Sequence, residues 1–353
     1  LRPPQAGTRL TRALEIETEP EAAKALLAAC ARWPRVASVQ PALEWLEFGS
    51  ETRDEACAIL FALDSEGLLT GPADRRRVAA ALRAAGPAKL TPDGLRLMVL
   101  TGNELDREAV ASLIDDPDAA SRGAAAAALA RRPEFAGRVI QAATLDPVLY
   151  PAAVTAVATH RPTPQGYASL RQIQAPTPAA ATAGLLAVAR AMQIDQLLTV
   201  ARTHETDPQM RVAILSTVGT ASATPEEREL INETKLLLAE TQLELADPEP
   251  ALASLAQVVS TSEEINRRAT QLRVTGLLWL NRIEEADSLN AGAEAWLAAL
   301  DRFPDEPHAV NVARATLDRF DDVLRDDERN RLNSIVQLAE QSGDVDMPEP
   351  TGG

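Results

Sequence analysis

Hydrophobic and polar positions follow a helical rhythm along most of this chain. In segments such as 20–33 (PEAAKALLAACARW) and 178–189 (PAAATAGLLAVA), apolar side chains recur at the i, i+3, i+4 spacing that puts them on one face of a helix. Long runs with the alternating pattern of a half-buried strand, rich in valine, threonine and tyrosine, are missing. The pattern therefore predicts an all-α protein.

The helices predicted from this rhythm recur at a regular interval. Similar segments open at a proline, and the last four openings are 30, 31 and 30 residues apart; the prolines are Pro20, Pro92, Pro117, Pro147, Pro178 and Pro208. Thr52 opens another without a proline. A threonine or aspartate before proline suits a helix start, because the first residue caps the helix and proline lacks only an N–H that has no intrahelical partner.

Further helical segments lie between these openings, over 104–114, 135–144, 167–175 and 194–204. Each unit is thus predicted to be a helix, a short turn and a second helix. A single hairpin cannot bury both of its faces, whereas stacked hairpins can, so we expect a right-handed α-solenoid. The longer spacing from Thr52 to Pro92 predicts an insertion around 63–77.

Residues 20–220 resemble the short, roughly thirty-residue form of the HEAT repeat. The match lies in an arginine followed at +3 and +7 by small or aliphatic residues, which occurs three times: Arg53 with Ala56 and Leu60, Arg122 with Ala125 and Leu129, and Arg211 with Ile214 and Val218. The units near 152 and 182 lack the arginine. The resemblance implies an adaptor surface whose concave face holds a partner segment.

Five consecutive alanines, 124–128, follow one of these openings. Alanine is the best helix former and adds little bulk, so it suits a helix squeezed between two neighbours. We expect these alanines to be packing positions. The alternative is a helix-favouring run on a solvated face.

From residue 225 the pattern changes to longer helical pairs. Two pairs are predicted to turn at 246–248 and at 281–282, and Ala251 and Ala286 occupy matching points 35 residues apart. The segment 225–340 resembles the tetratricopeptide repeat, whose period is ~34 residues. We expect the second helix of the second pair to extend through Ala299 and a closing helix pair to follow. The predicted domains are 1–220 and 221–342, with a disordered tail over 343–353.

Charge is distributed unevenly. The net charge is −16; residues 1–220 carry 24 acids and 23 bases, a balance of −1, and residues 221–353 carry 27 acids and 12 bases, a balance of −15. An acidic C-terminal third would repel phosphates, which argues against nucleic acid as a partner. A basic partner and simple solubility both stay open as its explanation.

The residue types that carry catalysis are dispersed. The three histidines, 160, 204 and 308, have no histidine or cysteine at metal-ligand spacing. The dense cluster 204–207 (HETD) falls in a predicted turn, where such residues commonly cap helices. Cys30 and Cys57 lie in apolar helical patterns and are interpreted as buried small hydrophobes. We therefore expect no catalytic residue, no metal site and no cofactor.

Four side chains are candidates for binding a partner. Arg53, Arg122 and Arg211 would fork the carboxylates of a partner if they formed a row on one surface. Alternatively, each binds the preceding turn and locks one unit to the next. Trp296 is either a partly exposed anchor or a core residue. The basic run 75–77 with Arg83 is either an anion site or a solvated face.

Two functions remain in view at the level of sequence. The first is a non-catalytic scaffold that binds another protein or a peptide on the concave surface of the solenoid. The second follows from the HEAT resemblance, because some HEAT-like proteins resemble bilin lyases and others resemble DNA-repair glycosylases. No stretch is apolar for the ~18 residues that a membrane-spanning helix needs. We expect a cytoplasmic location, or an exported or tethered one if a leader precedes Leu1.

Overall fold

The computed structural model describes residues 5–219, 224–303 and 308–342. Their secondary structure is helical, with no strand in any of these ranges, which confirms the all-α prediction. The chain divides into two compact units, Leu1–Ala191 and Met192–Gly353. Each unit is described below by itself, and the predicted change of repeat type near residue 220 stays a prediction.

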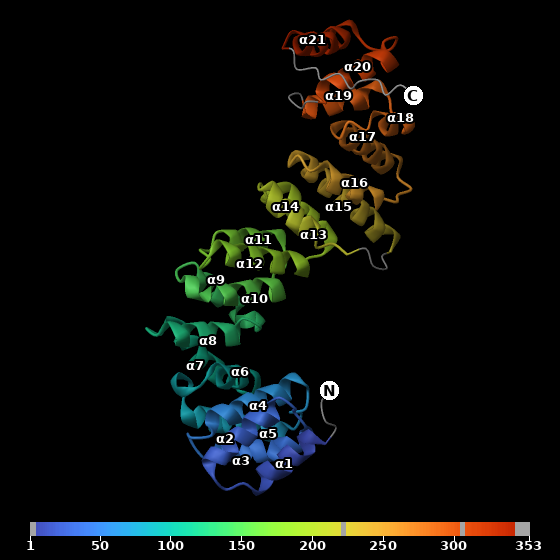
Figure 1. The fold of residues 1–353 in the computed structure, drawn as a ribbon. Helices are drawn as coiled ribbons and strands as arrows, with labels where there is room; N and C mark the ends of the chain where they lie inside the picture. The colour runs from blue at the N-terminus through green and yellow to red at the C-terminus, as the bar shows by residue number, and fades with distance from the viewer. Residues whose placement is uncertain (1–4, 220–223, 304–307, 343–353) are drawn as a thin grey trace. The chain divides into compact units, whose positions relative to one another are not determined.

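Unit 1 consists of helical hairpins, and the two helices of each hairpin lie in two different rows (Figure 1). The first row holds α1 (Ala6–Ile16), α3 (Val39–Phe48), α5 (Pro72–Ala85), α7 (Glu104–Ala111), α9 (Pro133–Ala143) and α11 (Pro164–Arg171). The second row holds α2 (Pro20–Ala31), α4 (Arg53–Ser65), α6 (Pro92–Thr101), α8 (Ala119–Leu129), α10 (Tyr150–His160) and α12 (Pro178–Ala191). Each second-row helix packs against the first-row helix before it, and successive second-row helices from α2 to α12 pack against one another.

Some helix starts in unit 1 follow the predicted capping, whereas Thr52 does not cap α4 with its side chain. The side chains of Thr91 and Thr163 accept hydrogen bonds from backbone N–H groups at the start of α6 and α11. Helix α8 begins two residues later than its proline predicts, because the side chain of Asp118 accepts from Ser121 N at 2.7 Å and is the cap. The expected insertion around 63–77 holds a turn and the start of the 14-residue helix α5, which belongs to the first row.

The alanine run lies on the packed side of α8 for the most part. Ala125 and Ala126 are fully buried and Ala128 is nearly so, whereas Ala127 is exposed. Helix α8 packs against α6 on one side and α10 on the other. The interpretation as packing positions is therefore confirmed for Ala125, Ala126 and Ala128, while Ala124 is half-buried and Ala127 is exposed.

Unit 2 contains the remaining helices. They are α13 (Ile194–Thr199), α14 (Pro208–Leu215), α15 (Pro225–Glu244), α16 (Pro248–Ala256), α17 (Glu263–Trp279), α18 (Ile283–Ser288), α19 (Ala293–Arg302), α20 (Ala309–Phe320) and α21 (Asp326–Ser342). Packed pairs include α15 with α16, α17 with α19 and α20 with α21 (Figure 1). The closing pair expected from the sequence is α20 and α21.

The two predicted turns of unit 2 have the same geometry. Ala246 and Asn281 both have left-handed backbone, with φ of 58° and 56°. In each turn the next N–H donates back to the carbonyl oxygen five residues earlier, from Asp247 to Gln242 and from Arg282 to Leu277, at 2.9 and 2.8 Å. This is the Schellman pattern that ends a helix. Ala251 and Ala286 are both fully buried, as expected for matching packing positions.

One helix prediction for unit 2 is wrong. Helix α18 ends at Ser288 rather than running through Ala299, and α19 is a separate helix. The reason is local: Asn290 has φ of 50°, a left-handed conformation that stops a right-handed helix. The predicted disordered tail, 343–353, lies outside the described residues.

Candidate binding site

Arg122 connects two neighbouring hairpins of unit 1. Its Nε donates to Asp146 Oδ2 at 2.7 Å, and its Nη1 donates to the carbonyl oxygens of Asp116 and Pro117, both at 2.9 Å. The first contact reaches the turn before α10, and the other two hold the turn before α8. These bonds match the structural interpretation of this arginine, in which it locks one unit to the next.

The other two arginines of the predicted row behave differently from each other. Arg211 donates to Glu244 Oε2 at 3.0 Å and to the backbone oxygen of Glu205 at 3.4 Å, so it holds the turn before α14 to α15. Arg53 is the first residue of α4, is half-buried, and makes no hydrogen bond or ion pair within the described ranges. Arg122 and Arg211 therefore have intramolecular carboxylate partners already.

Trp296 is a core residue. Its side chain is fully buried in α19, stacked edge-on against Phe320 with ring centroids 5.7 Å apart. The guanidinium of Arg319 lies 5.4 Å from the centre of the tryptophan ring. Because its side chain is buried, Trp296 cannot act as an exposed anchor for a partner.

The basic run at the start of α5 is mostly neutralised. Arg75 binds the carboxylate of Asp64, and Arg77 forks both oxygens of Glu47 at 2.9 and 2.8 Å. Arg83 forks Asp106 in the same way at 2.7 and 2.6 Å. Arg76 is exposed and bonds only to the backbone of its own helix. These contacts leave little free charge for an anion at this run.

The other clusters singled out in the sequence are structural. In the 204–207 turn, Asp207 accepts from Gln209 N at 3.0 Å and so caps α14. Cys30 and Cys57 are free thiols and buried, and burial raises the pKa of Cys57 to about 12, which keeps it protonated. Across the described part of the chain, no group of three metal-ligating side chains comes together.

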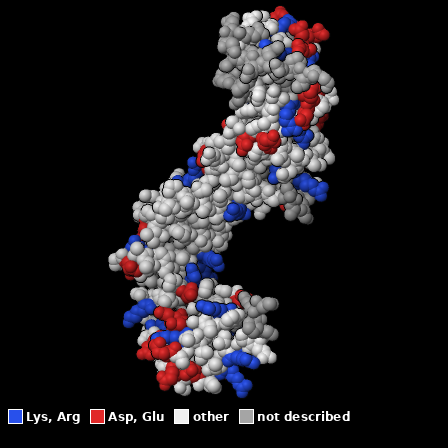
Figure 2. Space-filling view, viewed as in Figure 1, with Lys and Arg blue, Asp and Glu red and all other residues white. Residues whose placement is uncertain are grey.

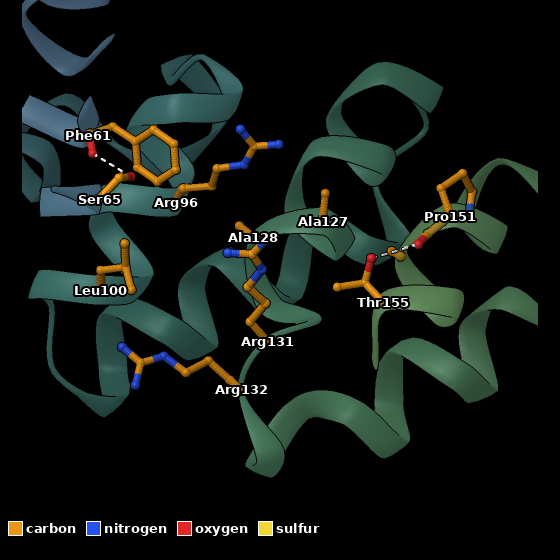
Figure 3. Close-up of a pocket in the computed structure, with 11 residues that line it drawn as sticks. Phe61, Ser65, Arg96, Leu100, Ala127, Ala128, Arg131, Arg132, Pro151 and Thr155 are labelled. Atoms are coloured by element: carbon orange, nitrogen blue, oxygen red, sulfur yellow. Dashed lines mark hydrogen bonds between the residues drawn. The ribbon is translucent and has the colours of Figure 1, made fainter. Parts of the chain in front are cut away.

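One hollow of unit 1 lies on its second row of helices (Figure 3). It has a volume of about 710 Å³ and is lined from α4, α6, α8 and α10. This volume lies within the ~300–1,000 Å³ typical of ligand pockets. We call it the second-row pocket. Its apolar lining comes from Phe61, Leu100, Ala127, Ala128, Pro151 and Ala152.

Within the part of the chain that the structure describes, the second-row pocket is lined by three arginines, Arg96, Arg131 and Arg132, and by no acidic residue. Arg96 lies with its guanidinium 5.5 Å from the ring centre of Phe61 and donates one hydrogen bond, at 3.2 Å, to Asp93. A guanidinium carries several N–H donors in a planar fork, so most of those of Arg96 have no acceptor in the described structure. The aromatic face holds the group in place.

Arg131 and Arg132 follow the end of α8. Arg132 donates to the backbone oxygen of Val99 at 2.9 Å, which fixes its side chain without cancelling its charge. Arg131 is exposed and has neither an ion pair nor a hydrogen bond to any described residue. Figure 3 shows Arg96 extending from α6 and Arg131 from the end of α8 into the space that the pocket encloses, while Arg132 turns toward Leu100.

The second-row pocket was not predicted from the sequence. The predicted binding arginines share one register, and that register places Arg122 and Arg211 in contacts between helices. The signal that marks the pocket is the pair Arg131-Arg132 directly after the alanine-rich helix and before Pro133. That pair belongs to the turn between α8 and α9, where side chains escape the helical packing pattern.

No family model matches this chain, and no curated protein matches it. Among solved structures, the crystal structure of an engineered protein from the Northeast Structural Genomics Consortium is 15% identical, covering 95% of this chain and 99% of that one, with a TM-score of 0.28. At this TM-score the likeness bears on neither fold nor function. No described helix has the length and apolarity required to cross a membrane.

Proposed function

We propose that this chain is a right-handed α-solenoid, HEAT-like in about 20–220 and tetratricopeptide-like in about 225–340, that acts as a non-catalytic scaffold. In this proposal, a segment of a partner protein binds the concave face formed by the second-row helices of unit 1. The second-row pocket is the proposed docking position.

The observation that supports this proposal is that several successive hairpins contribute side chains to the same pocket. Helices α4, α6, α8 and α10 belong to four successive hairpins, and each contributes side chains to one hollow. A segment bound there would contact several repeats at once, which is how repeat arrays use their extended surfaces. Small residues of α8 and α10, such as Ala127, Ala128 and Ala152, leave space for the side chains of a bound segment.

A display selection tests the proposal. A random peptide library is selected on the immobilised full chain, and recovered peptides are tested for competition and for binding to Ala127→Trp. Ala127 is exposed and lines the pocket, so an indole there fills the hollow without disturbing the core. We expect the recovered peptides to compete for one site and to lose binding to this variant.

The matched control is Ala120→Trp, at another exposed position on α8 that does not line the pocket. It should bind the peptides as the unsubstituted chain does. The proposal fails if no peptide is recovered, or if those recovered bind Ala127→Trp and Ala120→Trp equally well. Circular dichroism of both variants checks that the helices are intact.

A further inference from the structure

We infer that the partner segment is an acidic peptide: carboxylate side chains bind Arg96 and Arg131, and an apolar side chain between them lies on the apolar floor of the second-row pocket. This inference rests on the proposed function, because it names the chemistry of the segment that the pocket takes.

The charged side chains that line the second-row pocket are all arginines. Among the described residues, its lining contains three guanidinium groups and no carboxylate. Arg131 has no described partner and Arg132 is bonded to a neutral backbone oxygen, whereas Arg96 forms an ion pair with Asp93 through one N–H at 3.2 Å. The positive charge that no carboxylate balances therefore comes from Arg131 and Arg132. Elsewhere in unit 1, arginines such as Arg77, Arg83 and Arg122 are matched with carboxylates of the same unit. The pocket is thus a local excess of positive charge with planar donors suited to carboxylates.

The rest of the pocket lining is largely apolar, and we call this part the apolar floor. Phe61 on α4, Leu100 on α6 and Ala128 on α8 provide the apolar part of the lining, in the same pocket as Arg96 and Arg131 (Figure 3). An inorganic anion would leave this surface in contact with water, whereas a leucine-sized side chain covers it and gains from its burial. The pairing of carboxylates with an apolar side chain therefore matches the pocket better than charge alone.

A nucleic acid suits the pocket less well. A strand needs a basic groove that follows its backbone and aromatic platforms for its bases. Phe61 is the sole aromatic residue in the lining and already stacks on Arg96. Residues 145–191 carry few charges, and Figure 2 shows this part of unit 1 largely white in that view, so no described basic stripe continues from the pocket in that direction.

The test compares short fluorescein-labelled peptide pools on the full chain by fluorescence anisotropy. In the pools a central leucine is flanked by aspartate and glutamate, by asparagine and glutamine, or by phosphoserine; a single-stranded DNA oligonucleotide is the fourth probe. We expect the acidic pool to bind about tenfold more tightly than the amide pool, as charge-assisted hydrogen bonds imply. Its affinity should fall as salt rises from about 0.05 to about 0.5 M.

Charge-reversal variants test whether the preference for acidic peptides arises at the second-row pocket. Arg131→Glu should weaken the acidic pool about tenfold or more and leave the amide pool nearly unchanged. The matched control is Arg76→Glu, which makes the same change of net charge at an exposed position on α5 that bonds only to its own helix. It should leave both affinities within about twofold, because surface charges at a distance are screened.

The failures of the two proposals are distinguishable. Equal binding of acidic and amide pools, with both blocked by Ala127→Trp, overturns the acidic inference and leaves the scaffold in place. Tighter binding of the phosphoserine pool or of DNA than of the acidic pool also overturns it. Binding that ignores Ala127→Trp removes the pocket and the inference together.

Discussion

At the scale of single residues, the arginines of unit 1 divide by their acceptors. Arg83 and Arg122 fork carboxylates or backbone oxygens of adjoining helices and turns, so they hold hairpins together. Arg96 and Arg131 extend into the second-row pocket with most of their donors unused. The same residue type therefore has a structural role in one place and a proposed binding role in another, and only the acceptor distinguishes them.

The ion pair between Arg83 and Asp106 should make a measurable contribution to the stability of the fold. The carboxylate of Asp106 is 3% exposed, accepts both donors of Arg83 and also accepts from Asn103 N at 2.9 Å. The Arg83 hydrogen bonds lower the pKa of Asp106 below its ordinary value of 3.8, against the opposing effect of burial. Because the folded-state pKa is the lower one, this stabilisation is complete above the ordinary value and is lost as pH falls toward the folded-state pKa.

We therefore expect Asp106→Asn to lower the unfolding temperature at neutral pH by about 2–8 °C, from roughly 1–2 kcal/mol of lost stability. The difference from the unsubstituted chain should shrink as pH falls below the ordinary value of 3.8 toward the lower folded-state pKa, because protonation of Asp106 removes the same charge. Differential scanning calorimetry across pH measures both. Asp115→Asn is the control, since that side chain is 80% exposed; an equal loss in both variants would contradict the role of the Arg83 fork.

At the scale of elements, α8 is packed on one side and open on the other. Ala126 is fully buried, whereas Ala127, the next residue, lines the second-row pocket and is exposed. Adjacent alanines with opposite environments allow the packing account to be tested inside one helix, with the same chemical change at each position.

Ala126→Leu should destabilise the chain by about 1–3 kcal/mol, because added methylenes have no space in a close-packed interface. Ala127→Leu should change stability by no more than about 0.5 kcal/mol, as is usual for exposed positions. Urea unfolding followed by circular dichroism provides the comparison. Two variants of equal stability would mean that α8 is not confined as described.

The elements were largely predictable from the sequence, and the pocket was not. Proline openings and helical spacing located α2, α6, α12 and α14 to the residue, because proline in the first turn and a capping side chain are local signals. The end of α18 was missed because a left-handed asparagine, Asn290, has no unique sequence signature. The pocket was missed because Phe61, Arg96 and Arg131 come from separate hairpins, and only stacking brings them together.

At the scale of the whole molecule, charge is separated along the chain. Residues 1–220 are nearly neutral, and the excess of acidic residues follows them. A nearly neutral surface exerts little long-range attraction on a charged partner, so recognition at the second-row pocket depends on short-range contacts with Arg96 and Arg131. Figure 2 shows Lys, Arg, Asp and Glu intermingled over the N-terminal helices in that view, in keeping with this balance.

The most direct test of the account is where a bound acidic peptide slows backbone hydrogen exchange. Hydrogen–deuterium exchange followed by mass spectrometry compares the full chain alone with the chain saturated by the acidic peptide pool. The account predicts slower exchange concentrated in α6, α8 with the turn that carries Arg131, and α10. Slower exchange centred on the first-row helices or on unit 2, or none at all, would contradict it.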